Sequence, residues 1–267
     1  MRRITTTGLA LAVACIAFAT AATATPLPNS AVVHTRVFDD CPISIITVNN
    51  SWPAIVTIDD QNVSPQPFCS GFANLHTWRF STDGTNDIQF LNEDTFEFSC
   101  ELVLNGLGEG GLNLAPWWGP QADGLMNLRT TDGEIACFGG RLPFFSFTGA
   151  FGLVYVNNTP IQVGISYLPN GLSGASPAQV VYNIRYNAIN YTSGLLNFDQ
   201  GNPGENPPHG LWGALTPWYA GGHMKMFVNQ QPPQAHSMTG QWREIQYTSG
   251  PTPAKRSSWG DIKKLYR

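Results

Sequence analysis

Eight residues in the middle of the chain combine the side-chain types that hold a sugar. Carboxylates, amides and a guanidinium can hydrogen-bond hydroxyl groups, while an indole stacks on the apolar face of a pyranose ring. Six of the eight fall on the polar side of segments that alternate apolar and polar residues, and two are adjacent tryptophans between such segments. The predicted ligand-binding residues are Glu97, Glu101, Asn113, Trp117, Trp118, Asn127, Arg129 and Glu134. They predict a surface for a polysaccharide or another glycan.

Carboxylate spacing argues against hydrolysis by two residues of one strand. Glu97 and Glu101 share a face, but four residues of extended chain separate them by about 13 Å. A retaining pair of carboxylates needs about 5 to 5.5 Å and an inverting pair about 6.5 to 9.5 Å. Either residue paired across strands with Glu134 could be close enough, but the sequence does not set that register.

Other catalytic patterns are weak or missing. The nearest approach to Gly-x-Ser-x-Gly, residues 171–175, ends in alanine and is typical of a turn. A lyase acting on a uronate could use Arg129 and Arg141 as a clamp and His209 or His223 as a base. No Cys-x-x-Cys occurs and no histidine lies near a cysteine in the sequence, so we expect no metal site and no cofactor.

Three classes of function therefore remain open. We favour a binding protein, with a polysaccharide hydrolase or lyase as the alternative and a structural cell-surface protein as the second alternative. Binding is favoured because a polar sheet face with aromatic residues is visible in the sequence, whereas a nucleophile or an acid–base pair is not.

Short alternating segments must position the predicted site. In residues 95–102, four apolar side chains alternate with four polar ones, the period of two that a half-buried strand requires. The pattern recurs in 112–114, 126–129 and 134–137, with glycine-rich or Asp-Gly turns between them. This arrangement predicts an antiparallel meander with one face on a core and the other toward water or a ligand.

Further alternating segments predict a second layer of strands. A hairpin is expected from two segments near the N-terminus, and a closing strand near residue 225. The expected segments are 43–48 and 54–58 for the hairpin, 152–156, 161–168, 178–187 and 191–198 for the second layer, and 223–228 for the closing strand. With 12% charged residues, abundant glycine and proline, and no helical period, the composition predicts an all-β, jelly-roll β-sandwich of two antiparallel sheets.

The two ends of the chain have a different composition from its middle. Residues 1–24 have the form of a secretory signal with cleavage after Ala24; a membrane anchor is the alternative, but the apolar run is shorter than about 18 residues. Residues 25–37 are expected to be a linker, 38–228 the sandwich, and 229–267 a low-complexity tail with a short basic amphipathic end. We therefore expect a secreted, extracellular or cell-surface protein with no membrane span in the mature chain. The net charge of −4 disfavours nucleic acid as a partner.

Four cysteines remain after removal of the signal, an even number that suggests two disulfides in an exported protein. Cys41 and Cys69 bracket the expected hairpin and are the preferred pair. Cys100 and Cys137 are then left to pair, but a meander in sequence order would hold them roughly 14 Å apart, too far for a disulfide. Either the strand order is not sequential or the pairing differs.

The arrangement of strands and turns resembles the concanavalin A-like lectin and glucanase superfamily. The residues that carry the resemblance are 96–98, 108–112 and 135–140, together with Tyr167 and Tyr186, within a span from about residue 38 to 228. The resemblance implies a jelly roll whose concave polar sheet holds a sugar chain. The fold by itself decides nothing about catalysis. The glucanase branch of the superfamily carries a set of carboxylates on one strand, and residues 92–97 depart from that spacing by one position.

Overall fold

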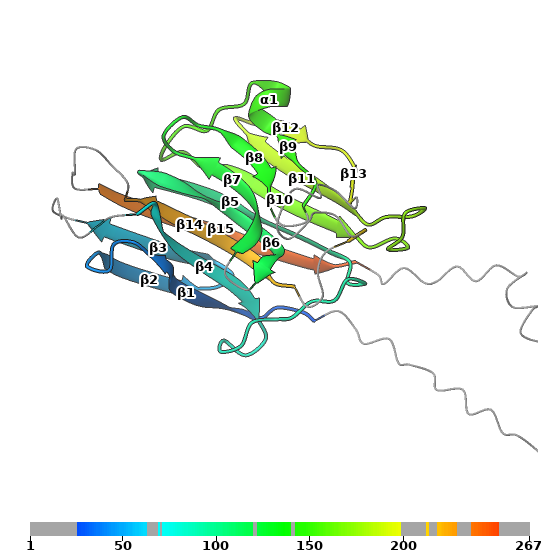
Figure 1. Ribbon diagram of the computed structural model, residues 1–267, viewed down its shortest axis with the longest axis horizontal. Helices are drawn as coiled ribbons and strands as arrows, with labels where there is room; N and C mark the ends of the chain where they lie inside the picture. Colours follow the sequence, from blue (N-terminus) through cyan, green and yellow to red (C-terminus); the bar gives the residue numbers. More distant parts are fainter. Residues whose placement is uncertain are drawn as a thin grey trace, which may run out of the picture.

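Two antiparallel β-sheets face each other in the computed structural model of the chain (Figure 1). The structure describes residues 26–62, 69, 71–119, 122–139, 142–198, 212–213, 218–228 and 236–250, without the side chains of 115–119 and 122–123. The predicted signal (1–24) and the basic end of the chain lie outside these ranges. The predicted all-β, jelly-roll class is confirmed, because neighbouring strands of each sheet are far apart in sequence.

The first sheet has seven strands, in the order β1-β4-β14-β6-β7-β8-β9. The bounds of its strands are β1 (Ser30–Asp39), β4 (Ala73–Ser81), β14 (Ala220–Phe227), β6 (Gly108–Gly119), β7 (Ala122–Arg129), β8 (Ile135–Phe138) and β9 (Phe145–Ser146). The second sheet has eight strands, in the order β12-β11-β10-β5-β15-β3-β2, with β13 paired to β11. The bounds of its strands are β12 (Ile189–Thr192), β11 (Gln179–Tyr186), β10 (Ile161–Leu168), β5 (Phe96–Gly106), β15 (His236–Ser249), β3 (Ile55–Asn62), β2 (Ile45–Ser51) and β13 (Leu196–Asn197).

Aromatic side chains fill the space between the sheets. Trp78 of β4 packs edge-on against Trp242 of β15, with ring centroids 6.1 Å apart, and both are fully buried. The indole nitrogen of Trp242 donates to the carbonyl oxygen of Gly111 at 2.9 Å, so its one polar atom is satisfied inside the core. These contacts join strands of opposite sheets into one hydrophobic core.

The predicted meander is only partly present. β6, β7 and β8 are neighbours in sequence order, as expected, but β5 lies in the other sheet between β10 and β15. Local alternation sets which side of a strand is apolar, whereas the choice of partner depends on contacts far along the chain. The expected closing strand exists as β14, but its expected position was wrong. It lies inside its sheet, between β4 and β6.

Residues 152–156 form no strand, contrary to expectation. They follow a short helix, α1 (Phe147–Phe151), which begins after the capping side chain of Ser146 and ends at Gly152 with a φ of 65°. Tyr155 is buried there, and its hydroxyl accepts a hydrogen bond from the backbone nitrogen of Leu104 at 2.8 Å. The segment therefore packs through the buried side chains of Leu153 and Tyr155 rather than through a strand ladder.

The sandwich also extends beyond both boundaries expected from composition. β1 begins at Ser30, inside the expected linker, and pairs with β4. β15 lies inside the expected tail, between β5 and β3, and buries Met238 and Trp242. Residues 229–267 are mostly polar on average, but β15 within them alternates apolar and polar residues, and its apolar residues complete the core.

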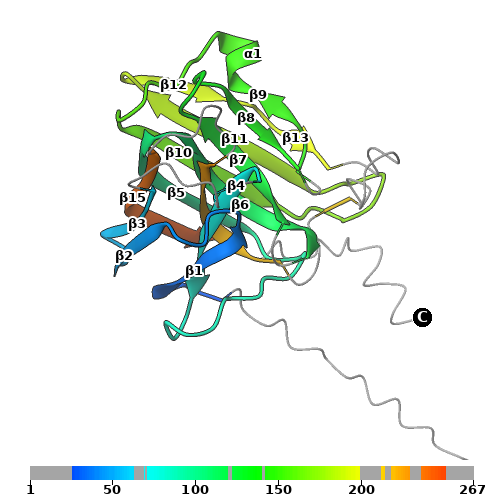
Figure 2. The same ribbon diagram turned by 60° about the vertical axis from the view of Figure 1, so that its left-hand side comes forward.

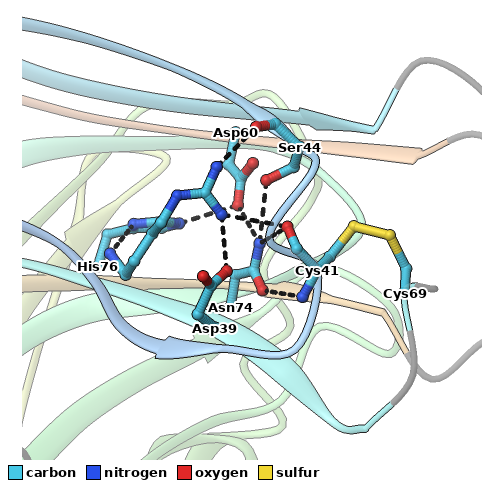
Figure 3. Close-up of a disulfide and its surroundings, with 8 residues drawn as sticks. Asp39, Cys41, Ser44, Asp60, Cys69, Asn74 and His76 are labelled. Atoms are coloured by element: carbon cyan, nitrogen blue, oxygen red, sulfur yellow. Dashed lines mark hydrogen bonds and ion pairs between the residues drawn. A yellow bond between two sulfur atoms is a disulfide. The ribbon is translucent and has the colours of Figure 1, made fainter.

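A buried polar cluster lies beside the Cys41–Cys69 disulfide, which confirms the preferred pairing (Figure 3). The backbone nitrogen of Arg36 donates to Nδ1 of His76 at 3.0 Å, so Nε2 carries the ring proton and donates to Asp60 at 2.9 Å. Asn74 donates to the same carboxylate oxygen at 2.9 Å and accepts from the backbone nitrogen of Cys41 at 2.8 Å. The cluster joins β3 to β4 across the two sheets.

Charge is retained on Asp60 although the carboxylate is fully buried. Burial alone would raise the pKa of Asp60, but hydrogen bonds with His76, Ser44 and Asn74 hold that pKa below its ordinary value. The guanidinium of Arg36 closes the cluster by donating to the carbonyl oxygens of Cys41 and Ser44 at 3.1 and 2.7 Å. This is a structural arrangement, because the side chains of Arg36, Asp60, Asn74 and His76 each bond to another chain segment.

The second expected disulfide is absent, and the expectation of no free thiol was wrong. Cys100 and Cys137 are free and buried, on β5 and β8 of opposite sheets. Sheets of a sandwich pack about 10 Å apart, whereas a disulfide requires Cα atoms within about 7 Å. Burial raises the pKa of both thiols, so they stay protonated and unreactive in the folded protein.

We therefore predict a stepwise thiol titration of the exported protein. A thiol reagent should label no cysteine in the native state, Cys100 and Cys137 after unfolding, and Cys41 and Cys69 only after reduction. Mass spectrometry of labelled peptides checks the assignment. Labelling of Cys41 without reductant, or a linked Cys100–Cys137 peptide, would contradict the structure.

Candidate functional site

The structure divides the eight predicted site residues between two opposite outer faces. Asn113, Asn127 and Arg129 lie on the seven-stranded sheet, with Glu134 just before β8. Glu97 and Glu101 lie on β5 of the eight-stranded sheet, so a carboxylate pair of either with Glu134 is excluded. Trp117 and Trp118 belong to β6, and their side chains lie outside the part that the structure describes.

On the seven-stranded sheet, the polar groups bond mainly to one another. Glu109 is at the centre of this network: it accepts from Lys225 at 2.8 Å and from Asn127 at 2.9 Å, and lies 3.7 Å from the guanidinium of Arg129. Burial would raise the pKa of Glu109, but the neighbouring charge of Lys225 and these hydrogen bonds hold it below its ordinary value. The carboxylate is therefore ionised and internally compensated.

His223 joins this network as a neutral side chain. It is fully buried, and its Nε2 lies 3.0 Å from the amide oxygen of Asn127. Burial, aided by the positive charge of Lys225 and opposed by Glu109, lowers the pKa of His223 to about 3. Since an amide oxygen only accepts, Nε2 carries the proton and is directed at Asn127.

Arg129 is held by carboxylates of the chain itself. It lies 2.8 Å from Asp132 and 2.9 Å from Glu134, in addition to Glu109. Burial would lower the pKa of Arg129, but these carboxylates raise it above its ordinary value. A uronate would have to displace these partners, so the geometry does not favour Arg129 as a clamp. Arg141 and His209, the other residues considered for a lyase, lie outside the described ranges.

The outer face of the eight-stranded sheet is different, because it is hollowed and open. A pocket of about 530 Å³ crosses five adjacent strands, β15, β5, β10, β11 and β12. Its floor follows one cross-strand row of registered partners, which are Gln246, Ser99, Gly164, Asn183 and Thr192. We call this pocket the cross-strand groove. Glu97 and Glu101 are among its lining residues, so two of the predicted site residues are part of it.

Small side chains at the middle of the row produce the hollow. A Cβ atom on Gly164 would lie 3.2 Å from the Cβ of Ser99 and 3.4 Å from the carbonyl oxygen of Phe98, closer than most such contacts. Gly164 therefore lets β5 and β10 pack closely, and it places no side chain over the floor of the groove. On one side of the row, Glu101, Gln162 and Arg185 form a registered line of longer polar side chains.

An aromatic pair lies at the β12 edge of the sandwich, on the core side of the sheet. Tyr191 is registered with the buried Ile184, so its ring shares the core face, and it packs against Phe151 of α1 with ring centroids 5.4 Å apart. The helix lies beside β12 in both views of the molecule (Figures 1 and 2). The pair covers the edge of the core, whereas Asn190 and Thr192 of the same strand lie on the outer face.

Sequence reasoning missed several of the lining residues, although a signal for them was present. In the segments expected at 161–168 and 178–187, polar residues alternate with core residues and therefore point outward. The residues missed are Ser99, Gln162, Gly164, Asn183, Arg185, Asn190, Tyr191, Thr192, Glu244 and Gln246. The sequence did not show the strand order of the sheet, in which β5 and β15 follow β12, β11 and β10.

Comparison with known proteins gives structural similarity only. No protein-family model matches the chain, and no curated protein matches it. An alginate lyase from Corynebacterium sp. is 13% identical, with a TM-score of 0.39 over 77% of this chain and 81% of that one. Alginate lyase A1-II', a member of polysaccharide lyase family 7, is 10% identical, with a TM-score of 0.39 over 73% and 80% of the two chains.

Lectins are also similar to the chain in structure. Lectin UEA-II in complex with galactose is 10% identical, with a TM-score of 0.35 over 84% of this chain and 96% of that one. At these identities the comparisons carry no argument about a ligand or a reaction.

Within the described ranges, no group of histidine, cysteine, aspartate or glutamate side chains is placed to hold a metal ion. In the same ranges, no helix is long and apolar enough to cross a membrane.

The network around Glu109 predicts a pH-dependent loss of stability in Glu109→Gln. Because its folded pKa lies below the ordinary value of about 4.5, ionised Glu109 stabilises the protein fully above that pH, and the contribution is lost as pH falls through the folded pKa. The variant should lose about 1.5 to 3 kcal/mol at neutral pH, with the difference shrinking in acid. Denaturant unfolding across pH measures this.

Glu134→Gln is the matched control, because Glu134 binds the same network through Arg129 but is 43% exposed. It should cost less than about 1 kcal/mol. Equal losses in the two variants, or a loss in Glu109→Gln that does not change with pH, would show that Glu109 is not the centre of the network.

Proposed function

We propose that the chain is a secreted carbohydrate-binding protein and that a glycan occupies the cross-strand groove. The observation that carries the proposal is the registered row from Gln246 to Thr192, which places short and amide side chains in an open hollow of about 530 Å³. Amides such as Asn183 both donate and accept, as sugar hydroxyls require.

Binding fits the groove better than hydrolysis does. The registered neighbours of Glu97 are Ser166 and Thr248, and those of Glu101 are Gln162 and Arg243. Neither glutamate therefore has a carboxylate directly opposite on a neighbouring strand, and the two are about 13 Å apart along β5. A pair at the separations that glycoside hydrolysis needs does not follow from this register.

Two observations support secretion. The Cys41–Cys69 disulfide is of a kind that persists in oxidising compartments. The first 24 residues of the sequence have the form of an export signal. Polysaccharides of a cell surface or an extracellular matrix are the partners that such a protein would meet.

Substitutions in the groove should weaken glycan binding without unfolding the protein. Asn183→Ala and Gln246→Ala should each cost about 0.5 to 1.5 kcal/mol of affinity through lost hydrogen bonds. A glycan array should first identify a ligand, and calorimetry should then compare the variants. Asn49→Ala is the matched control, because this exposed amide does not line the groove.

Product release must be measured in the same samples. Binding with no product supports the proposal, whereas release of sugar by the wild-type protein would favour the hydrolase or lyase alternative. Binding that survives both groove substitutions but is lost in Asn113→Ala would place the site on the seven-stranded sheet. If no glycan binds or is cleaved, the structural cell-surface alternative is favoured.

A further inference from the structure

The length and charge of the cross-strand groove indicate which glycans it accepts, provided that it is the glycan site proposed above. The groove crosses five strands, and four gaps between neighbouring strands give a length of about 19 Å. This is several times the size of one sugar ring. β12 is the last strand on its side of the sheet, so the groove reaches the sheet edge there.

The charge of the groove is uneven and predominantly negative. Glu97, Glu101 and Glu244 line its β5 and β15 end, whereas Arg185 is its one lining cation among the described residues. Glu101 is partly compensated by Arg243 at 3.4 Å. Glu97 and Glu244 are exposed, and neither forms an ion pair with another described residue. Two uncompensated carboxylates therefore face the ligand at this end.

We propose that the groove binds the interior of a linear polysaccharide that carries no carboxylates, with the sugar chain running across the strands. Carboxylate oxygens accept hydrogen bonds from sugar hydroxyls or amino groups, which favours neutral and amino sugars. A polyuronate would place like charges within several ångströms of Glu97 and Glu244, and this repulsion is unfavourable even near a solvated surface. Specificity thus comes from a repulsive element as well as an attractive one.

Interior binding follows from the shape of the site. The row from Gln246 to Thr192 presents an amide and a hydroxyl on each side of Gly164, and the pocket is open rather than enclosed. Successive rings would repeat similar contacts, so affinity should increase with the number of rings until the groove is filled. A site for single sugars or chain ends would instead reach full affinity with one ring.

The test is calorimetry of the mature protein with three probe series at low and high salt. The probes are neutral gluco-oligosaccharides and oligomers of N-acetylglucosamine, each from one to six rings, and oligogalacturonates of matched length. Affinity for at least one neutral series should rise steadily through the first few rings and then level off. Oligogalacturonates of equal length should bind about tenfold more weakly at low salt, and added salt should narrow that gap.

The double variant Glu97→Gln/Glu244→Gln should bind oligogalacturonates more tightly than the wild type does, with neutral affinity changed less. Glu93→Gln, an exposed glutamate that does not line the groove, is the control and should leave the preference unchanged. Equal or tighter wild-type binding of oligogalacturonates, or affinity independent of chain length, would overturn this inference while leaving glycan binding intact. Absence of binding to every probe, and to a broad glycan array, would instead overturn the proposed function itself.

Discussion

The register of β5 between β10 and β15 is the constraint on which the rest of the structure depends. It places Phe98 in the core and Ser99 on the outer face, opposite Gly164 on one side and Gln246 on the other. A slip of one residue would reverse both faces, moving core side chains into water and closing the groove. The hydrophobic core and the binding surface are therefore specified by the same strand pairing, and burial of the phenylalanine side chains stabilises both.

The two outer sheet faces show why polarity alone does not define a binding site. On the seven-stranded sheet, Glu109, Asn127 and His223 are buried and bonded to one another, so a ligand would have to replace existing contacts. On the eight-stranded sheet, Asn183 and Gln246 lie in an open hollow. Buried polar groups that bond to one another fix the fold, whereas accessible groups arranged along a row are available to a partner.

Period-two alternation in the sequence was sufficient to assign the two sides of β5, and the all-β class followed from composition. It could not show that β5 leaves the meander, because strand pairing depends on β10 and β15, which lie far along the chain. The same limit explains why Glu97 and Glu134 were expected on one surface and why a Cys100–Cys137 disulfide was expected. Three-dimensional neighbours, unlike the faces of a strand, are not encoded locally.

A crystal structure of the mature protein with a linear neutral oligosaccharide tests the central claim most directly. The account predicts sugar rings that follow the row from Gln246 through Gly164 to Thr192. Sugar bound on the seven-stranded sheet near Asn113, with the cross-strand groove empty at saturating ligand, would contradict it.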